Sequence, residues 1–304
     1  QTETLYENGR MESFLEESSS SGERASAFAS DLCVVTGSEP SSDSGVNAEA
    51  ATLFSVKDKQ VLFQKNPFER MNPASITKIM TALLTIENLP DLNETITVPE
   101  DIFEELTAQD ASVAGFNPYE QPTVRDLLYG VLLPSGADAC ETLARAVGGS
   151  EEGFVAMMNQ KAEELGLTNT HFENCTGLHN DNHYSTCRDI AVLMSECLKS
   201  DTFREIVTRE VYTTEATASH PEGITLYDTM LHRFTSYEMS TTLENGAVIE
   251  GGKTGFTDEA GQCLVSFAEY GGEEYILVTA EAMTDSGSAV DSIADASTVY
   301  GRLQ

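Results

Sequence analysis

Strand-like segments near both ends of the chain enclose a helical middle, and this order is the strongest constraint on the fold. Near the start, two apolar runs, 50–55 and 61–64, are separated by a short polar segment, which is typical of a β-hairpin. Near the end, the runs 263–268 and 275–280 flank a Gly-Gly turn and predict a second hairpin. A sheet built from both ends of the chain, with helices inserted between, is an α+β design.

Helical signals fill the middle of the chain, up to about residue 200. Thr123 and Asp126 have the spacing of a capping box, so we expect a helix to begin after Thr123. Helical spacing of apolar residues predicts helices over 124–133, 138–147, 151–165 and 187–198. The same spacing predicts one further helix near the end of the chain, over 289–303. Residues 95–98 have the composition of a short strand, whereas 169–184 show no period and should form a long loop.

Composition separates a tail from a folded domain. Residues 1–30 are rich in Ser and Glu, and such a segment cannot bury enough apolar surface to offset the entropy of ordering it. We therefore expect 1–30 to be flexible. The remaining residues, 31–304, are numerous enough for a substantial core, and we expect them to form the folded domain, with a helical lobe at about 88–200.

The charge balance excludes some partners. The chain has 17 basic and 50 acidic side chains, a net charge of −33, so nucleic acid and anionic membrane surfaces are not expected partners. It contains no run of 18 apolar residues, so no transmembrane helix is expected. Because the chain begins with Gln1 rather than Met, we expect a signal or anchor to have preceded it and an extracytoplasmic location.

The cysteines do not indicate a metal centre. The six are Cys33, Cys140, Cys175, Cys187, Cys197 and Cys263. None forms a C-x-x-C pair, and the histidines lack metal-ligand spacing, so we expect no metal. The sequence also has no G-x-G-x-x-G loop, and no cofactor is expected. Sequence alone does not choose among the possible disulfide pairings, and most of these cysteines could equally be small buried apolar residues.

Residues 73–81, PASITKIMT, bring a serine and a lysine together. Pro73 breaks the chain, and the apolar residues after it recur at helical spacing, which places Ser75 in the first turn of a buried helix. Lys78 follows three residues later, on the same face. Burial and the helix dipole both lower the pKa of such a lysine, so its neutral amine could take the proton of the serine. The motif S-x-x-K also arises by chance, as a capping serine beside a solvated lysine.

Two later segments favour the catalytic interpretation of that motif. They are Ser135-Gly136-Ala137 and Lys253-Thr254-Gly255, and with Ser75-x-x-Lys78 they resemble the penicillin-recognising serine enzymes. The flanking residues resemble the serine D-alanyl-D-alanine carboxypeptidases in particular, the low-molecular-weight penicillin-binding proteins of peptidase family S11. The segments that carry this closer resemblance are 73–81, 132–139, 183–186 and 252–257. The resemblance extends over about 30–301.

The resemblance implies a fold and a chemistry. The fold is that of the penicillin-binding transpeptidases: an antiparallel sheet flanked by helices, plus an all-helical lobe, with the serine between them. Ser75 would attack the penultimate D-alanine of a peptidoglycan stem pentapeptide, and Lys78 would take its proton. Ser135 would then relay the proton to the departing D-alanine. Water would release the acyl-enzyme, whereas a β-lactam would leave Ser75 acylated.

The resemblance also implies how the substrate is held. Lys253 would raise the local positive potential and, with Thr254, bind the terminal carboxylate. The backbone N–H groups of Ser75 and Phe256 would form the oxyanion hole, in which one donor is typically worth about 10²–10³ in rate. Gly255 fits this arrangement independently, because a substrate lying along a strand leaves no room for a side chain there.

Two departures from the family pattern affect these expectations. Ala137 stands where the family usually has an asparagine that bonds the substrate and the catalytic lysine, so we expect weaker positioning. Asp138 would not replace that asparagine, because a helix places it on another face. The family often has an arginine after its last strand for the terminal carboxylate, but 264–301 contains none. Lys253 and Thr254 would then hold the carboxylate themselves.

Two other functions remain open at this point. A serine β-lactamase would need a glutamate on a loop to activate water, and the loop 169–184 offers only Glu173. A catalytically weak penicillin-binding or wall-sensing domain is compatible with Ala137. His183 could act as a base, but we expect it to pack or hydrogen-bond within its loop. Asp181 and Asp189 are interpreted as loop and cap residues.

Overall fold

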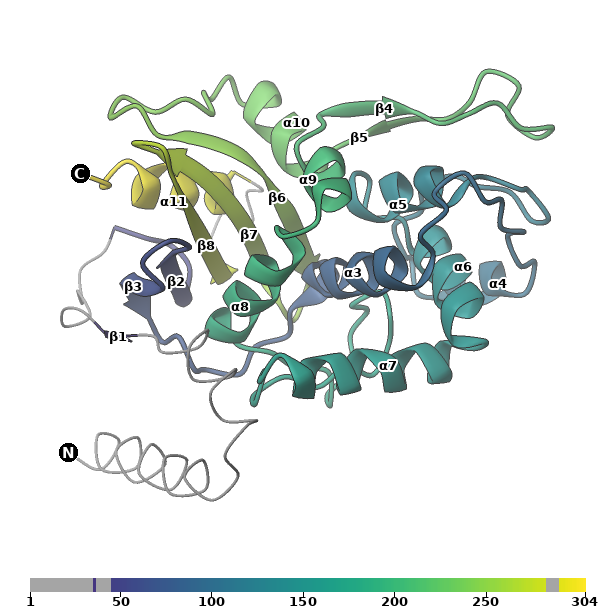
Figure 1. Cartoon of the computed structure of the whole chain (residues 1–304), viewed down its shortest axis with the longest axis horizontal. Helices are drawn as coiled ribbons and strands as arrows, with labels where there is room; N and C mark the ends of the chain where they lie inside the picture. The colour runs from purple at the N-terminus through teal and green to yellow at the C-terminus, as the bar shows by residue number, and fades with distance from the viewer. Residues whose placement is uncertain (1–34, 37–44, 283–289) are drawn as a thin grey trace.

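The computed structural model describes residues 35–36, 45–282 and 290–304, and a six-stranded sheet joins both ends of the chain (Figure 1). Its strands lie in the order β1-β3-β2-β8-β7-β6. Their bounds are β1 Val35–Thr36, β2 Ala50–Ser55, β3 Gln60–Lys65, β6 Val248–Thr257, β7 Gly261–Tyr270 and β8 Glu273–Ala282. Every neighbouring pair is antiparallel except β1 and β3. The two predicted hairpins and the α+β fold class are confirmed.

Helices separate the two parts of the sheet along the chain. After a 3₁₀ turn, η1 (Ala74–Thr77), the helices are α3 Lys78–Asn88, α4 Ile102–Ala108, α5 Val124–Leu132, α6 Ala137–Gly148, α7 Glu151–Glu164, α8 Cys187–Cys197 and α9 Asp201–Val207. The short strands β4 (Val211–Thr213) and β5 (Thr225–Tyr227) and the helix α10 (Thr229–Ser236) follow, and α11 (Asp291–Tyr300) comes last. Thr123 and Asp126 form the predicted capping box at the start of α5.

The helices cover both faces of the sheet. On one face, α10 packs on β6 and α11 packs on β7 and β8 (Figure 1). Their apolar side chains, such as Met230 and Ile293, form a core cluster with Leu264 and Leu277 of the strands. The other face carries a larger cluster that continues into the helical lobe. Burial on both faces explains why β7 reads as a continuous apolar run.

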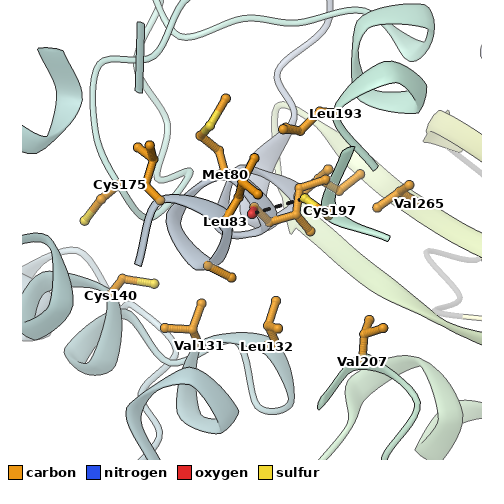
Figure 2. Packing of buried hydrophobic residues seen from close by; sticks show 14 of the residues in the cluster. Met80, Leu83, Val131, Leu132, Cys140, Cys175, Leu193, Cys197, Val207 and Val265 are labelled. Carbon is orange, nitrogen blue, oxygen red and sulfur yellow. Dashed lines mark hydrogen bonds between the residues drawn. The ribbon is translucent and has the colours of Figure 1, made fainter. Parts of the chain in front are cut away.

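Helix α3 is the centre of the larger cluster. Figure 2 shows its Met80 and Leu83 among side chains that come from α5, α8 and β7. Ile79, Met80 and Ala82 are fully buried, so α3 has no solvated face over these turns. Because Lys78 begins this helix and Ser75 lies in the 3₁₀ turn directly before it, the packing of the core fixes their position.

The five cysteines that the structure describes behave as small apolar residues. All five are buried and unpaired: Cys140, Cys175, Cys187, Cys197 and Cys263. In Figure 2 the thiol of Cys197 donates a hydrogen bond to the carbonyl of Ile79. Within the same described residues, no helix combines the length and the hydrophobicity that crossing a bilayer would require.

Several sequence expectations need correction. Residues 95–98 form no strand, because Thr95 makes only an isolated bridge to Thr123. Ser75 lies in the turn η1 rather than in the helix itself, which begins at Lys78. The sequence analysis did not anticipate α9, β5 and α10, which are elements of three to eight residues. The predicted flexible segment 1–30 lies outside the described residues.

Candidate active site

The turn before α3 holds Ser75 against Lys78. Asn72 shapes this turn, because its side-chain oxygen accepts the backbone N–H of Ala74 at 2.8 Å and Ala74 has a positive φ of 47°. Lys78 Nζ lies 2.8 Å from Ser75 Oγ and donates to the carbonyl of Thr176 at 2.6 Å. The lysine side chain is therefore directed at the serine by a backbone acceptor from a distant loop.

Burial prepares Lys78 to act as a base. Its side chain is almost completely enclosed, and the loss of hydration lowers the pKa of its amine, although the nearby thiols of Cys140 and Cys175 and the carboxylate of Asp138 oppose this shift. A neutral lysine nitrogen has a lone pair, and the Ser75 hydroxyl is within hydrogen-bond distance of it. Such a pair meets the geometric requirement for activating a serine nucleophile.

The loop that carries Thr176 fits against the serine turn only because it contains a glycine. Gly177 has a φ of +82°, and a Cβ at this position would lie 1.8 Å from the carbonyl oxygen of Ala74. The N–H of Gly177 donates to the side chain of Asn174 at 2.7 Å. The sequence predicted only an irregular loop here, because the backbone carbonyls of Thr176 and Ala74, which contact Lys78 and Gly177, leave no signature in residue types.

A second pair of side chains joins the helical lobe to the sheet. Ser135 follows α5 in a left-handed conformation, with φ of +66°, which bends the chain sharply between α5 and α6. Its hydroxyl accepts a hydrogen bond from Lys253 Nζ at 3.0 Å, and Lys253 also donates to the carbonyl of Thr254 at 3.0 Å. Lys253 extends from β6 and is fully buried.

The two lysines affect each other electrostatically. Burial and the charge of Lys78 together lower the pKa of Lys253 to about 7, although the carboxylate of Asp228 acts in the opposite direction. Burial also raises the pKa of Asp228 to about 7, although its backbone hydrogen bonds and the charge of Lys253 act to lower this pKa. The structure thus brings the predicted Ser75, Lys78, Ser135 and Lys253 into one site as two hydrogen-bonded pairs.

Ala137 and Asp138 lie where the family pattern and this chain diverge. Ala137 begins α6 and is buried, with no side-chain group that could bond Lys78. The Asp138 carboxylate accepts the backbone N–H groups of Ala114, Gly115 and Phe116 at 2.7 to 3.0 Å. These bonds hold residues 114–116 beside α6 and occupy the Asp138 carboxylate. As expected, Asp138 therefore does not replace the asparagine that the family usually has at position 137.

Strand β6 passes directly beside the serine turn. A Cβ on Gly255 would lie 2.9 Å from the carbonyl oxygen of Pro73 and 3.2 Å from the backbone nitrogen of Ser75. Since β6 is at the edge of the sheet, one side of its backbone has no strand partner within the described part of the chain. Thr254 Oγ1 lies 2.6 Å from Thr229 Oγ1 of α10, and Phe256 as a whole residue is 52% exposed.

The candidate residues that sequence reasoning set aside have structural contacts. His183 is buried, with Nε2 2.8 Å from Thr77 Oγ1, and its Nδ1 accepts the backbone N–H of Glu173. Burial lowers the pKa of His183 to about 4, so the ring is neutral at physiological pH. The carboxylate of Asp189 accepts the backbone N–H of Asn169, and the N–H of Asp189 donates to the cap residue Thr186.

One group in the described residues has the ligand types of a metal site. The carboxylates of Glu141 and Glu151 and the thiol of Cys175 lie within 4.8 Å of one another. Burial and the neighbouring Glu151 raise the pKa of Glu141 to about 8, and burial raises that of the Cys175 thiol. Protonated groups are poor ligands, and the thiol donates to Glu141 at 3.6 Å instead. That the chain needs no metal stays a prediction.

Comparison with known proteins places this geometry in a family. The family profile of the D-alanyl-D-alanine carboxypeptidases matches residues 35–284. The D-alanyl-D-alanine carboxypeptidase DacF of Bacillus subtilis (strain 168) is 35% identical over 238 residues, which are 78% of this chain and 58% of DacF. The D-alanyl-D-alanine carboxypeptidase of Streptomyces sp. (strain K15) is 36% identical over 223 residues, 71% of this chain and 74% of that protein.

Solved structures resemble the fold over most of this chain. The crystal structure of the Streptomyces K15 DD-transpeptidase superimposes with a TM-score of 0.72 at 29% sequence identity and covers 87% of this chain and 99% of that one. A D-alanyl-D-alanine carboxypeptidase from Mycobacterium tuberculosis H37Rv gives a TM-score of 0.71 at 27% identity, with 87% and 92% covered.

Proposed function

The chain belongs to the D-alanyl-D-alanine carboxypeptidase family, and on this premise we propose that it removes the terminal D-alanine from peptidoglycan stem pentapeptides. The observation that carries the proposal is the pair formed by Ser75 and Lys78 at 2.8 Å, beside the pair formed by Ser135 and Lys253. The chain spans 58% of the length of the Bacillus relative, so the activity is inferred from this site and not from the relative's name.

The first step forms an acyl-enzyme. Neutral Lys78 accepts the proton of the Ser75 hydroxyl while Ser75 Oγ bonds to the carbonyl carbon of the penultimate D-alanine. The negative charge that develops on the carbonyl oxygen is stabilised by the backbone N–H groups of Ser75 and Phe256. The close approach of β6 to the serine turn at Gly255 supports this placement of the two donors.

The second step releases D-alanine. The peptide C–N bond breaks, and the proton that Lys78 took from Ser75 passes to the departing amine through the Ser135 hydroxyl, which Lys253 holds by a hydrogen bond. The positive charge of Lys253 also favours binding of the substrate's terminal carboxylate, near the hydroxyl of Thr254. Water then attacks the ester on Ser75, and the serine regains its proton.

The proposal includes a location and an inhibitor class. Because stem peptides lie in the cell wall, we assign the catalytic domain, residues 31–304, to the outside of the cytoplasm. A β-lactam mimics the D-Ala-D-Ala end, and its ring would open on Ser75 in the same way. We expect no cofactor, because each proton transfer has a side chain within hydrogen-bond distance.

The direct test is to incubate the protein with a pentapeptide that ends in D-Ala-D-Ala and to measure released D-alanine. We expect release by the unchanged protein and none by Ser75→Ala, because no other nucleophile occupies that position. Lys199→Met, which changes an exposed lysine paired with Glu196, is the control and should retain full activity. Release that survives in Ser75→Ala would contradict the assignment.

A fluorescent penicillin separates the alternatives. Long-lived labelling of Ser75 supports the carboxypeptidase, rapid turnover of the label indicates a β-lactamase, and no labelling indicates a non-catalytic domain. Since the K15 structure is described as that of a DD-transpeptidase, an amine such as glycine should also be added to the pentapeptide assay. A peptide product extended by glycine would show that the acyl group goes to amines as well as to water.

A further inference from the structure

His179 is a residue of the loop 169–184 that the proposed mechanism does not use, and it contacts the segment that carries Ser75. Its ring nitrogen Nδ1 lies 3.0 Å from Nδ2 of Asn72. Asn72 in turn holds the serine turn, because its Oδ1 accepts the backbone N–H of Ala74 at 2.8 Å. These two hydrogen bonds connect the loop to the residue directly before Ser75.

The Asn72 amide determines the direction of the hydrogen bond to His179. Because the amide oxygen accepts the N–H of Ala74, the group that faces His179 is the NH₂, which can only donate. Nδ1 of His179 must therefore be the acceptor, and the proton of the ring belongs on Nε2.

Two carboxylates near the ring favour this position of the proton. Oδ1 of Asp181 lies 3.3 Å from Nε2 of His179, whereas Oε2 of Glu259, in the turn between β6 and β7, lies 3.9 Å from Nδ1. Since the attraction between a proton and a carboxylate falls with distance, Asp181 favours a proton on Nε2 more than Glu259 favours one on Nδ1. A proton on Nδ1 would make this nitrogen a donor and would end its bond from Asn72.

The backbone of Ala74 needs the restraint that Asn72 provides. Its φ of +47° is an unfavourable conformation for a residue with a Cβ, so the surrounding contacts must hold it there. The carbonyl of Ala74 and the N–H of Ser75 belong to one planar peptide unit. The backbone angles of Ala74 therefore set the direction of that N–H, which is one of the two donors proposed for the oxyanion hole.

We infer that His179 is a positioning residue of the active site: its Nδ1 accepts a hydrogen bond from the Asn72 amide and thereby keeps the amide oxygen on the N–H of Ala74. The same loop directs Lys78 through the carbonyl of Thr176, so one segment holds both members of the catalytic pair. His179 acts through Asn72, one step removed from the reacting atoms. The inference rests on the proposed function, because it concerns the same active site.

The test measures the rate at which a fluorescent penicillin acylates the protein over a range of penicillin concentrations, which separates non-covalent binding from acylation. We expect His179→Leu to lower the limiting acylation rate about 3- to 10-fold, the effect of one hydrogen bond. The dissociation constant should change by less than about 2-fold, because the Ser75 N–H acts on charge that develops only in the transition state. His179→Asn, whose side-chain oxygen can replace Nδ1 as the acceptor, should stay within about 2-fold of the unchanged rate.

His171 provides a matched control from the same loop. Its side chain is 42% exposed, against 41% for His179, and its ring contacts the carboxylate of Glu173 at 2.8 Å. His171→Leu should therefore change neither the limiting acylation rate nor the dissociation constant. A similar loss of rate in His171→Leu and His179→Leu would mean that the histidines only support the loop, and it would overturn the inference.

A double-mutant cycle with Asn72 tests whether His179 acts through this residue. Asn72→Ala should slow acylation at least as much as His179→Leu does, and adding His179→Leu to it should cost less than about a further 2-fold. Losses that multiply, or an unchanged rate in His179→Leu, would overturn the inference.

The free energies of unfolding of the same four proteins, measured with a denaturant, should be non-additive in the same way. This second cycle does not depend on activity. If the unchanged protein is not acylated by penicillin, the proposed function fails, and the unfolding cycle still decides whether His179 and Asn72 are coupled. Additive losses in the free energy of unfolding would refute the contact on which the inference rests.

Discussion

Replacing Lys78 by methionine should lower the rate at which penicillin acylates Ser75 by about 10²–10⁴-fold, the usual contribution of general base catalysis. Methionine keeps an unbranched apolar stem for the enclosed position but has no nitrogen to accept the proton. Acylation by the unchanged protein should become faster with rising pH as Lys78 loses its proton, and the variant should lack this rise. Rates measured from pH 5.5 to 10 with a fluorescent penicillin test both points.

The same variant separates catalysis from stability. Burial lowers the pKa of Lys78, so the folded state binds fewer protons than the unfolded state below the ordinary lysine pKa of about 10.4. The lysine therefore costs stability at neutral pH, and this cost decreases as pH rises toward that value. Lys78→Met should melt no lower than the unchanged protein at pH 7. A variant that retains the full acylation rate would contradict the role of Lys78 as the base.

Replacing Gly177 by alanine should have the largest structural effect of any single methyl group near the site. Its Cβ would lie 1.8 Å from the carbonyl oxygen of Ala74 at a φ of +82°, so either the loop or the turn that holds Ser75 must move. We expect a loss of about 2–4 kcal/mol in the free energy of unfolding and at least about 100-fold slower acylation, because small misplacements of reacting groups are costly.

Gly271 offers a matched control for that variant. It also has a positive φ, +62°, but a Cβ there meets no atom within 4 Å. Gly271→Ala should therefore show only the backbone cost, about 1 kcal/mol, with unchanged acylation. The free energy of unfolding, measured with a denaturant, and the rate of penicillin labelling should be compared between Gly177→Ala and Gly271→Ala. Equal losses in the two variants would show that the contact with Ala74 is not important.

The sequence alone predicted those elements and site residues that a local pattern of residues identifies. Alternating and continuous apolar runs predicted both hairpins, and helical spacing predicted α5 through α8, because periodicity reports which face is buried. The motifs of Ser75, Ser135 and Lys253 identified side chains that the structure brings together from η1, the end of α5 and β6. Motif residues carry their chemistry in their side chains, so they can be recognised without coordinates.

The rest depends on contacts between distant segments. The acceptor that directs Lys78 is the backbone carbonyl of Thr176, which any residue could provide. Arg233 of α10 donates a hydrogen bond to Gln262, which lies on β7, two elements later in the chain, and no spacing rule connects these two residues. Asp138 could be excluded as a substitute for asparagine, but its three backbone hydrogen bonds become apparent only in the folded chain.

The most direct measurement is to locate the acyl group after incubation with benzylpenicillin. Trypsin cleaves after Arg70 and Lys78, so Ser75 lies in a peptide of residues 71–78, and mass spectrometry can determine which peptide gains the penicilloyl group. We predict one equivalent on this peptide and none in Ser75→Ala. A protein that gains no adduct, or that carries it on another peptide such as the one containing Ser135, would contradict the account.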